Sequence, residues 1–168
     1  MEKFKLIGKG RFSTAYQNKN TVYIKSQDPV KECFALFPVN SSYFPKVSLS
    51  DLPEFDYKMP LYNKVRAPKK QLNDISLVIY QELRELFKNI PIPFSKKESD
   101  YSILYRLFSG IKSSKRLKTA LINAIDHLAN YGADIGFEIS PRNIAATKSG
   151  NLILLDCFFL KRALKGDF

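Results

Sequence analysis

The sequence predicts an α+β fold in two parts, a strand-rich N-terminal third and a mostly helical remainder. Short apolar segments separated by turn residues fill residues 1–60, which is typical of an antiparallel sheet. Residues 71–88 and 113–131 instead repeat apolar side chains at helical spacing. The chain has 168 residues and is 45% hydrophobic, so it can bury the core of one compact domain or of two small lobes.

An antiparallel meander is expected at the N-terminus. The apolar run 4–7 leads into GKGRFSTAY, and the turn 18–20 separates this segment from the apolar strand 21–25. A short helix should follow, because Asp28 is a good N-cap and Pro29 suits the first helical position. Two further extended segments complete this part, residues 46–49 and 55–59.

The remainder is predicted to be helical until a late hairpin. Helices are expected at 71–88, 99–110 and 113–131, and the proline-rich segment 89–94 connects the first two. Two apolar runs flank turn residues between positions 143 and 156, which indicates a β-hairpin. We place the boundary after residue 60, which gives parts of residues 1–60 and 61–168.

The chain is strongly basic, with 27 Lys and Arg against 16 Asp and Glu and a net charge of +11. This balance favours anionic partners such as a nucleotide, an acidic protein surface or a nucleic acid. The alternative is that the lysines form solvated helix faces. No nucleic-acid-binding motif accompanies the charge, so nucleic acid is the less favoured partner.

Other features of the composition indicate a reduced, cytoplasmic protein. The two cysteines, Cys33 and Cys157, lie far apart and form no CxxC pair. The chain has one histidine, His127, which excludes a histidine-based metal site. It has no apolar run of about 18 residues, so no membrane partner is expected. The N-terminus MEKFKLIGKG is unlike a secretory signal.

The segment IGKGRFSTAY, residues 7–16, contains a GxGxF pattern between two predicted strands. Glycine has no Cβ, so the backbone N–H groups of such a loop can approach a triphosphate closely. A strand is expected to follow, which excludes a Rossmann fingerprint, and the missing GK[ST] ending excludes a P-loop. A plain hairpin turn is the alternative interpretation.

Lys25 ends an apolar strand one hairpin after this loop. There its ammonium could reach the α- and β-phosphates of a nucleotide. Glu32, in the predicted helix that follows, is a candidate ion-pair partner for Lys25. The alternative is a lysine that is simply solvated.

The C-terminal quarter holds two side chains that suit a hard cation. Asn143 offers an amide oxygen and Asp156 a carboxylate, and Mg²⁺ takes few protein oxygens in addition to phosphate oxygens. A lone acidic residue, Glu138, precedes them. Residues 136–143 read GFEISPRN and residues 156–158 read DCF.

In this order the glycine-rich loop, Lys25, GFEISPRN and DCF resemble the protein-kinase superfamily, with its HRDLKPEN catalytic loop and its metal-binding DFG segment. Within it, the chain is most similar to the compact serine/threonine kinases of T-odd-type lytic bacteriophages. The resemblance covers nearly the whole chain, although residues 63–112 match only by helix pattern. It implies a two-lobed fold with a small antiparallel β N-lobe and a minimal, mostly helical C-lobe.

The resemblance also implies an activity, namely ATP- and Mg²⁺-dependent phosphorylation of serine or threonine on host proteins in the host cytoplasm. It assigns catalytic roles to Lys25, Glu138, Asn143 and Asp156, the last two as metal ligands. ATP is expected to contact the loop, the following strand and helix, the hinge and the floor of its site, that is Ile7, Gly8, Lys9, Gly10, Arg11, Phe12, Ser13, Ala15, Lys25, Glu32, Met59, Leu61 and Ala145.

Several positions depart from the family pattern. Glu138 stands where the family has its catalytic aspartate, Gly136 replaces the usual His or Tyr, and Ser140 replaces a lysine. Tyr23 replaces a small residue and is expected to point to the same side as Lys25, toward the nucleotide. Either the small Ala145 leaves room for the tyrosine, or Tyr23 blocks the adenine pocket.

Only 12 residues follow Asp156, which leaves no room for a full activation segment. These departures support an alternative, a pseudokinase-like protein that inhibits or tethers a partner through its basic surface. Phosphorylation of a small molecule and binding of nucleic acid are further alternatives.

Overall fold

The computed structural model describes residues 3–10, 12–88, 99–132 and 134–161. Its fold is α+β, as the sequence predicts. None of the helices in these ranges combines the length and the hydropathy that a bilayer span requires.

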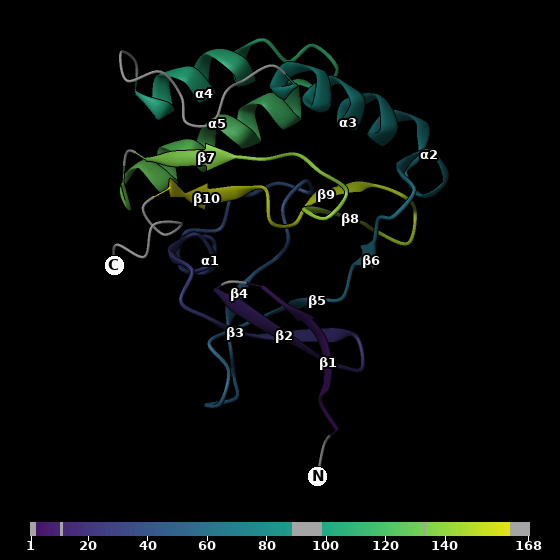
Figure 1. The fold of residues 1–168 in the computed structure, drawn as a ribbon, viewed down its shortest axis with the longest axis vertical. Coiled ribbons are helices and arrows are strands. Elements are labelled where there is room, and N and C mark those ends of the chain that lie inside the picture. Colours follow the sequence, from purple (N-terminus) through teal and green to yellow (C-terminus); the bar gives the residue numbers. More distant parts are fainter. Residues whose placement is uncertain (1–2, 11, 89–98, 133, 162–168) are drawn as a thin grey trace. The chain divides into compact units, whose positions relative to one another are not determined.

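The packing divides the chain into two compact units. Unit 1 comprises residues 1–38 and 45–61, and unit 2 comprises residues 39–44 and 62–168. In Figure 1, unit 1 carries strands β1 to β5 and unit 2 carries the teal, green and yellow elements.

The sequence gives no sign that residues 39–44 belong with the later part of the chain. Two contacts of Tyr43 explain it. The Tyr43 carbonyl accepts a hydrogen bond from the N–H of Leu154 at 2.7 Å, and the Tyr43 hydroxyl bonds Ser114 Oγ at 3.0 Å.

Unit 1 is built on a five-stranded antiparallel sheet with the order β1-β2-β3-β5-β4. Hairpins join β1 to β2 and β2 to β3, so the predicted meander is confirmed. The β2–β3 turn has two residues, Lys19 and Asn20, and Lys19 takes a left-handed φ of 52°. The strands are β1 (Lys5–Lys9), β2 (Ser13–Asn18), β3 (Thr21–Ser26), β4 (Ser48–Leu49) and β5 (Tyr57–Pro60).

The predicted short helix is confirmed as α1 (Pro29–Leu36). Asp28 caps it, because Asp28 Oδ1 accepts the N–H of Val30 at 3.0 Å. Pro29 occupies the first turn, where its missing N–H costs no hydrogen bond. Ala35 packs the helix against the core of the sheet, which consists of Val22, Ile24, Val47 and Tyr57.

The helices of unit 2 follow the sequence pattern with one addition. The helix predicted over 71–88 is confirmed as α3, which begins at Asp74 because Asn73 caps it. The short helix α2, residues 68–71, precedes it and was not predicted. The helices predicted at 99–110 and 113–131 are confirmed, and a serine caps each of them. The described helices of unit 2 are α2 (Pro68–Gln71), α3 (Asp74–Phe87), α4 (Asp100–Ser109) and α5 (Lys115–Ala129).

Two small sheets complete unit 2. The predicted hairpin is confirmed as β8–β9, with Gly150 at a φ of +78° in its turn, and β6 pairs with β8. The other sheet pairs β7 with β10, an arrangement that the sequence does not predict. The strands are β6 (Asn63–Lys64), β7 (Ile135–Phe137), β8 (Ile144–Ala146), β9 (Leu152–Leu154) and β10 (Phe158–Leu160).

Aromatic rings fill the core beneath the β7–β10 sheet. Phe137 and Phe158 pack edge to face at 4.9 Å between ring centroids, and Phe108 of α4 contacts both. Such pairs add about 1 kcal/mol each to the burial of their apolar area. The packing fixes the two strands whose ends carry the acidic residues of interest.

Candidate functional site

The glycine-rich segment of unit 1 is a tight turn at the end of β1. The N–H of Gly10 donates to the Ser13 carbonyl at 2.8 Å, and Gly8 pairs with Ala15 in the ladder. Arg11, predicted to contact the nucleotide, lies outside the described residues.

The fold itself does not require glycine at positions 8 and 10. A Cβ at Gly8 would lie 4.0 Å from its nearest neighbour and one at Gly10 would lie 3.6 Å away, both ordinary contacts. Because glycine weakens a strand by roughly 0.5–1 kcal/mol relative to alanine, these residues cost stability without a packing reason. One physical explanation is the register shift of the β1–β2 pairing between Leu6 and Gly8, and close approach of a ligand to the backbone is another.

Three of the predicted nucleotide contacts share one face of the sheet. Ile7, Ala15 and Met59 all pack against the core around Val22 and Ile24. The pairing explains this, because Ala15 stands opposite Ile24 and Met59 stands opposite Val22, and paired residues project to the same face. We call this the Ala15 face.

Lys25 lies on the other face of the same sheet. It pairs with Thr14, one residue out of step with the Ala15–Ile24 pair. Its ammonium sits 5.5 Å from the centroid of the Phe55 ring. The structure therefore does not bring Lys25 together with Ile7, Ala15 and Met59.

Tyr23 lies on the same face of the sheet as Lys25, as strand alternation predicts. This face is opposite to the Ala15 face. The Tyr23 ring contacts Phe4 at 5.4 Å and Phe55 at 5.3 Å between centroids. These rings form an aromatic cluster with Tyr16 on the far side of the sheet. Tyr23 therefore shares the face of Lys25, as predicted, and does not cover the Ala15 face.

The expected pairing of Lys25 with Glu32 is not met. Within the described residues no ion pair joins them, and the Glu32 side chain is exposed on α1. The acidic residue of this region that does pair with a lysine is Asp28, whose Oδ2 lies 3.4 Å from Lys31 Nζ.

The remaining contacts predicted in unit 1 lie along its edges. Lys9 is exposed and pairs with Thr14, and Phe12 accepts the N–H of Gln27 through its carbonyl at 3.1 Å. Leu61, predicted to contact ATP at the hinge, donates its N–H to the Asn20 carbonyl at 2.8 Å.

Hydrogen bonds bring Glu138, Asn143 and Asp156 together at one end of unit 2. The Asn143 carbonyl accepts the N–H groups of Leu155 and Asp156 at 3.0 and 3.1 Å. The N–H of Glu138 donates to the Cys157 carbonyl at 2.8 Å, so the loop before β8 and the loop after β9 are bonded to each other. Residues far apart in sequence thus share one end of unit 2.

The Asn143 side chain is oriented by this network. Its Nδ2 donates to the Glu138 carbonyl at 3.4 Å, which leaves Oδ1 as an acceptor with no partner in the described part of the chain. The Asp156 and Glu138 side chains are both exposed. One amide oxygen and two carboxylates are therefore presented at this end.

The buried thiol of Cys157 has a raised pKa, to which two carboxylates contribute. Burial raises the pKa of Cys157 well above its ordinary value, and the negative charges of Asp156 and Glu138 raise it further. Its Sγ lies 3.2 Å from the Asn143 carbonyl. Cys157 therefore stays a neutral packing residue.

Two further residues hold the loop that carries Glu138, and sequence reasoning missed both roles. Arg84 of α3 donates from Nη1 to the Ile139 carbonyl at 3.0 Å, over a separation that no local pattern signals. Gly136 lies under the Phe159 ring, where a Cβ would come within 2.3 Å of a ring carbon. The glycine that departs from the kinase pattern thus accommodates a ring from β10.

Ala145 lies in β8, between Lys64 of β6 and Ile153 of β9, and is 1% exposed. Its small side chain belongs to the packed interior of the three-stranded sheet.

The donor set of unit 2 fits Mg²⁺. Within residues that the structure describes, no three His, Cys, Asp or Glu side chains gather as a metal-binding group. Asn143 and Asp156 instead offer one amide oxygen and one carboxylate, and Mg²⁺ completes its shell with water and phosphate oxygens. A cage made wholly of protein ligands is not required.

Comparison with models of known protein families and with curated proteins found no match.

Proposed function

We propose that the chain is an ATP- and Mg²⁺-dependent phosphotransferase with a kinase-like two-lobed fold, in which unit 1 is the N-lobe and unit 2 the C-lobe. Its proposed acceptors are serine or threonine hydroxyls of proteins, with host proteins as the substrates if the chain is of phage origin. The observation that carries the proposal is the bonding of Glu138, Asn143 and Asp156 at one end of unit 2.

In this proposal Asn143 Oδ1 and the Asp156 carboxylate hold Mg²⁺, which neutralises phosphate charge when it is bound. The exposed carboxylate of Glu138 orients the acceptor hydroxyl and takes its proton. Glutamate is one methylene longer than aspartate, so Glu138 reaches further from the loop that Arg84 and Asn143 anchor.

Unit 1 contributes the glycine-rich turn and the apolar Ala15 face. Backbone donors of a turn without Cβ atoms suit phosphate oxygens, and the side chains of Ile7, Ala15 and Met59 suit an adenine ring. The packing does not require glycine at positions 8 and 10, which supports a ligand-binding role for the turn.

Phosphoryl transfer is tested with γ-labelled ATP and dephosphorylated casein as the acceptor. We expect Mg²⁺-dependent labelling of casein, or of the chain itself, by the unmodified protein. Asp156→Asn and Glu138→Gln should each reduce the rate about 100-fold or more, because metal binding and proton transfer each contribute that much to such reactions.

Glu85→Gln is the matched control. Glu85 is an exposed carboxylate of α3 whose partner is Lys88 at 3.6 Å, so its loss should leave the rate unchanged. Labelling that persists in Asp156→Asn, or no labelling of any acceptor by the folded protein, contradicts the proposal.

A second candidate function, binding of an acidic partner without catalysis, is favoured by a basic hollow in unit 2. This hollow has a volume of about 620 Å³, and Lys115 and Arg116 of α5 line it together with the segment 40–43. The charge-reversed variant Lys115→Glu/Arg116→Glu should abolish binding of a polyglutamate peptide if this is the main function. An Asp156→Asn variant should then bind that peptide as the unmodified protein does.

A further inference from the structure

The basic hollow of unit 2 has the size and the lining of a small-molecule site. Its volume of about 620 Å³ falls in the range of about 300–1,000 Å³ that such sites occupy. Lys115 and Arg116 are its charged residues, and no carboxylate of the described chain lines it. Uncharged polar side chains supply most of the remaining lining, namely Asn40, Ser41, Ser42, Thr119 and Asn123.

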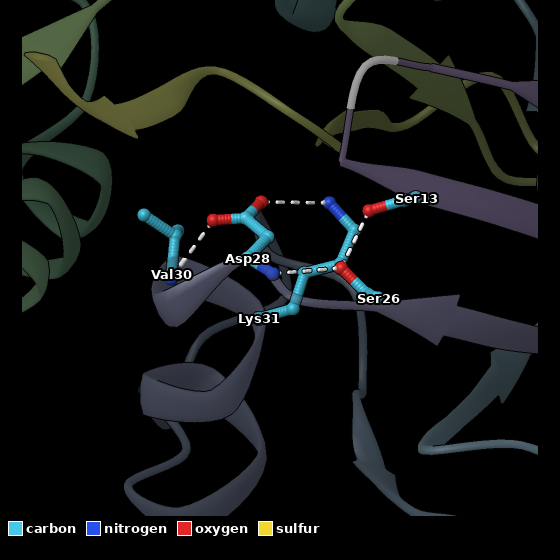
Figure 2. Close-up of polar contacts among 5 residues, drawn as sticks. All are labelled: Ser13, Ser26, Asp28, Val30 and Lys31. Atoms are coloured by element: carbon cyan, nitrogen blue, oxygen red, sulfur yellow. Dashed lines mark hydrogen bonds and ion pairs between the residues drawn. The ribbon is translucent and has the colours of Figure 1, made fainter. Parts of the chain in front are cut away.

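The two cations of the hollow are not neutralised by the described part of the chain. Both side chains are exposed, and within the described residues neither forms a hydrogen bond or an ion pair. They stand in the first turn of α5, which contains no acidic residue. Lys31, in the first turn of α1, is by contrast paired with Asp28 at 3.4 Å (Figure 2). Since positive charge is destabilising at the start of a helix, the arrangement in α5 suits an anionic ligand.

Hydrogen bonds hold the segment 40–43 against the start of α5, so the hollow is preformed. The Tyr43 hydroxyl bonds Ser114 Oγ at 3.0 Å, and the same Oγ caps the helix by accepting the N–H of Leu117 at 3.1 Å. Within the segment, Ser41 Oγ accepts the N–H of Tyr43 at 3.2 Å. A preformed site binds its ligand without the entropic cost of ordering its own residues.

The neutral side chains of α5 that line the hollow are placed beside one of the cations. Lys115, Thr119 and Asn123 follow one another at intervals of four residues, so they share one face of the helix. In the described part of the chain the side chains of Thr119 and Asn123 have no hydrogen-bond partner. A hydroxyl and an amide, which both donate and accept hydrogen bonds, are therefore open to a ligand next to an ammonium.

The charges of the hollow select the kind of anion. A phosphate monoester carries a charge of about −1.5 to −2 at pH 7, so it suits two neighbouring cations better than a single carboxylate does. The planar guanidinium of Arg116 can pair with two phosphate oxygens, and the ammonium of Lys115 acts as a point charge. The organic part of the ligand would then meet amides and hydroxyls, which suit a polar body such as a sugar.

We propose that the basic hollow binds a phosphate monoester of a small polar molecule, such as a sugar phosphate. Lys115 and Arg116 hold the phosphate group, and Thr119 and Asn123 hydrogen-bond the polar body. The inference goes beyond both candidate functions, because it gives unit 2 a ligand site that requires neither phosphoryl transfer nor an acidic peptide.

Calorimetry with glucose 6-phosphate, glucose and inorganic phosphate tests the site in the full chain. The unmodified protein should bind glucose 6-phosphate more tightly than inorganic phosphate and should not bind glucose. In Lys115→Met and in Arg116→Met the affinity for glucose 6-phosphate should fall about tenfold or more, the loss expected for a charge-assisted hydrogen bond. Asn123→Ala should weaken binding of glucose 6-phosphate and leave that of inorganic phosphate unchanged.

Lys118→Met is the matched control, because Lys118 belongs to the same helix but does not line the hollow. Lys118→Met and Asp156→Asn should both bind glucose 6-phosphate as the unmodified protein does, which separates this site from the proposed Mg²⁺ site. Because Lys115 and Arg116 are exposed, their variants should keep the circular dichroism of the unmodified protein.

Four results would overturn the inference. The unmodified protein could bind neither phosphate compound, or the Lys115→Met and Arg116→Met variants could bind glucose 6-phosphate undiminished. Loss of binding in Asp156→Asn would assign the phosphate to the proposed Mg²⁺ site. Tighter binding of a polyglutamate or phosphoserine peptide would assign the hollow to a protein partner. Phosphoryl transfer to casein tests the proposed function separately, so failure of one leaves the other standing.

Discussion

The glycines of this chain differ in whether the structure leaves room for a side chain at their positions. Gly8 and Gly10 have space for a Cβ and no positive φ, whereas Gly136 is covered by the Phe159 ring. The same substitution to alanine should therefore act on ligand binding in one case and on stability in the other.

Gly8→Ala should keep or slightly raise the free energy of unfolding, by up to about 1 kcal/mol, because alanine is less flexible in the unfolded chain. Its added methyl group should nevertheless weaken Mg²⁺·ATP binding, since the backbone would be held away from the phosphates. Urea unfolding and calorimetry measure the two effects. A variant with undiminished ATP affinity would assign this turn a purely local role.

Gly136→Ala should destabilise unit 2 by about 1–3 kcal/mol, because its Cβ would overlap the Phe159 ring at 2.3 Å. Urea unfolding of this variant and of Gly136→Ala/Phe159→Leu measures the coupling. In the Phe159→Leu background, Gly136→Ala should lower the free energy of unfolding by less than it does when Phe159 is present. Additive effects would contradict the proposed overlap.

At the scale of elements, the start of α3 is tied to the β8–β9 turn. Asn73 Oδ1 accepts the N–H of Ser76 at 2.9 Å, and Asn73 Nδ2 donates to Asn151 Oδ1 at 2.7 Å. The N–H of Asn73 also donates to the Gly150 carbonyl at 3.0 Å. One residue therefore both caps a helix and anchors a hairpin.

Asn73→Ala should cost about 2 kcal/mol in urea unfolding, since it removes a cap and a side-chain bond to the hairpin. Ser99→Ala at the start of α4 is the control. Ser99 Oγ accepts the N–H of Ser102 and so caps α4, but Ser99 contacts no hairpin. Its loss should therefore cost about 1 kcal/mol. Equal costs would show that the Asn73–Asn151 contact adds nothing.

Glu82 of α3 holds the segment before α5. Its Oε1 and Oε2 accept the N–H groups of Lys112 and Ser113 at 2.8 and 3.0 Å. Burial by itself would raise the pKa of Glu82, but the hydrogen bonds from Ser113 and from the backbone outweigh burial and lower it. The ionised carboxylate is therefore the form that stabilises this junction.

A lowered folded-state pKa means that this stabilisation is present above the ordinary glutamate value near 4.5 and is lost as the pH falls through the folded-state value. Glu82→Gln should thus cost about 1 kcal/mol at pH 7, and its difference from the unmodified protein should shrink below pH 4.5. Urea unfolding of both proteins at pH 7, 4.5 and 3.5 measures this difference in the free energy of unfolding. A difference that does not change with pH contradicts the assignment.

The sequence predicts elements well where several residues cooperate in one signal. The cap and proline at the start of α1 and the long periodicity of α5 both specify their helices. Strands of two or three residues such as β6, β7 and β10 carry no measurable alternation, so only tertiary pairing reveals them.

The face of Lys25 could not be predicted for a related reason. The two-residue turn at Lys19 and Asn20 sets the register of β2 and β3, and a shift of one residue moves every side chain to the other face. The order of Glu138, Asn143 and Asp156 was visible in the sequence. Their hydrogen bonds to one another depend on the β7–β10 pairing and were not.

At the scale of the whole molecule, each unit has its own core and carries its own part of the proposed function. The sheet of unit 1 presents an apolar face beside a glycine-rich turn, and unit 2 presents an amide and two carboxylates at the ends of β7, β8 and β9. The central claim of the proposed function is that the chain binds a nucleotide together with Mg²⁺.

Stability measured with and without nucleotide tests this claim most directly. ATP at about 100 times its Kd should stabilise the folded protein by roughly 2.7 kcal/mol in the presence of Mg²⁺. Removing Mg²⁺, or replacing Asp156 by asparagine, should abolish most of this gain, while the Glu85→Gln control should retain it. Stabilisation by ATP that is the same with and without Mg²⁺ and in Asp156→Asn, or no stabilisation at all, would contradict the account.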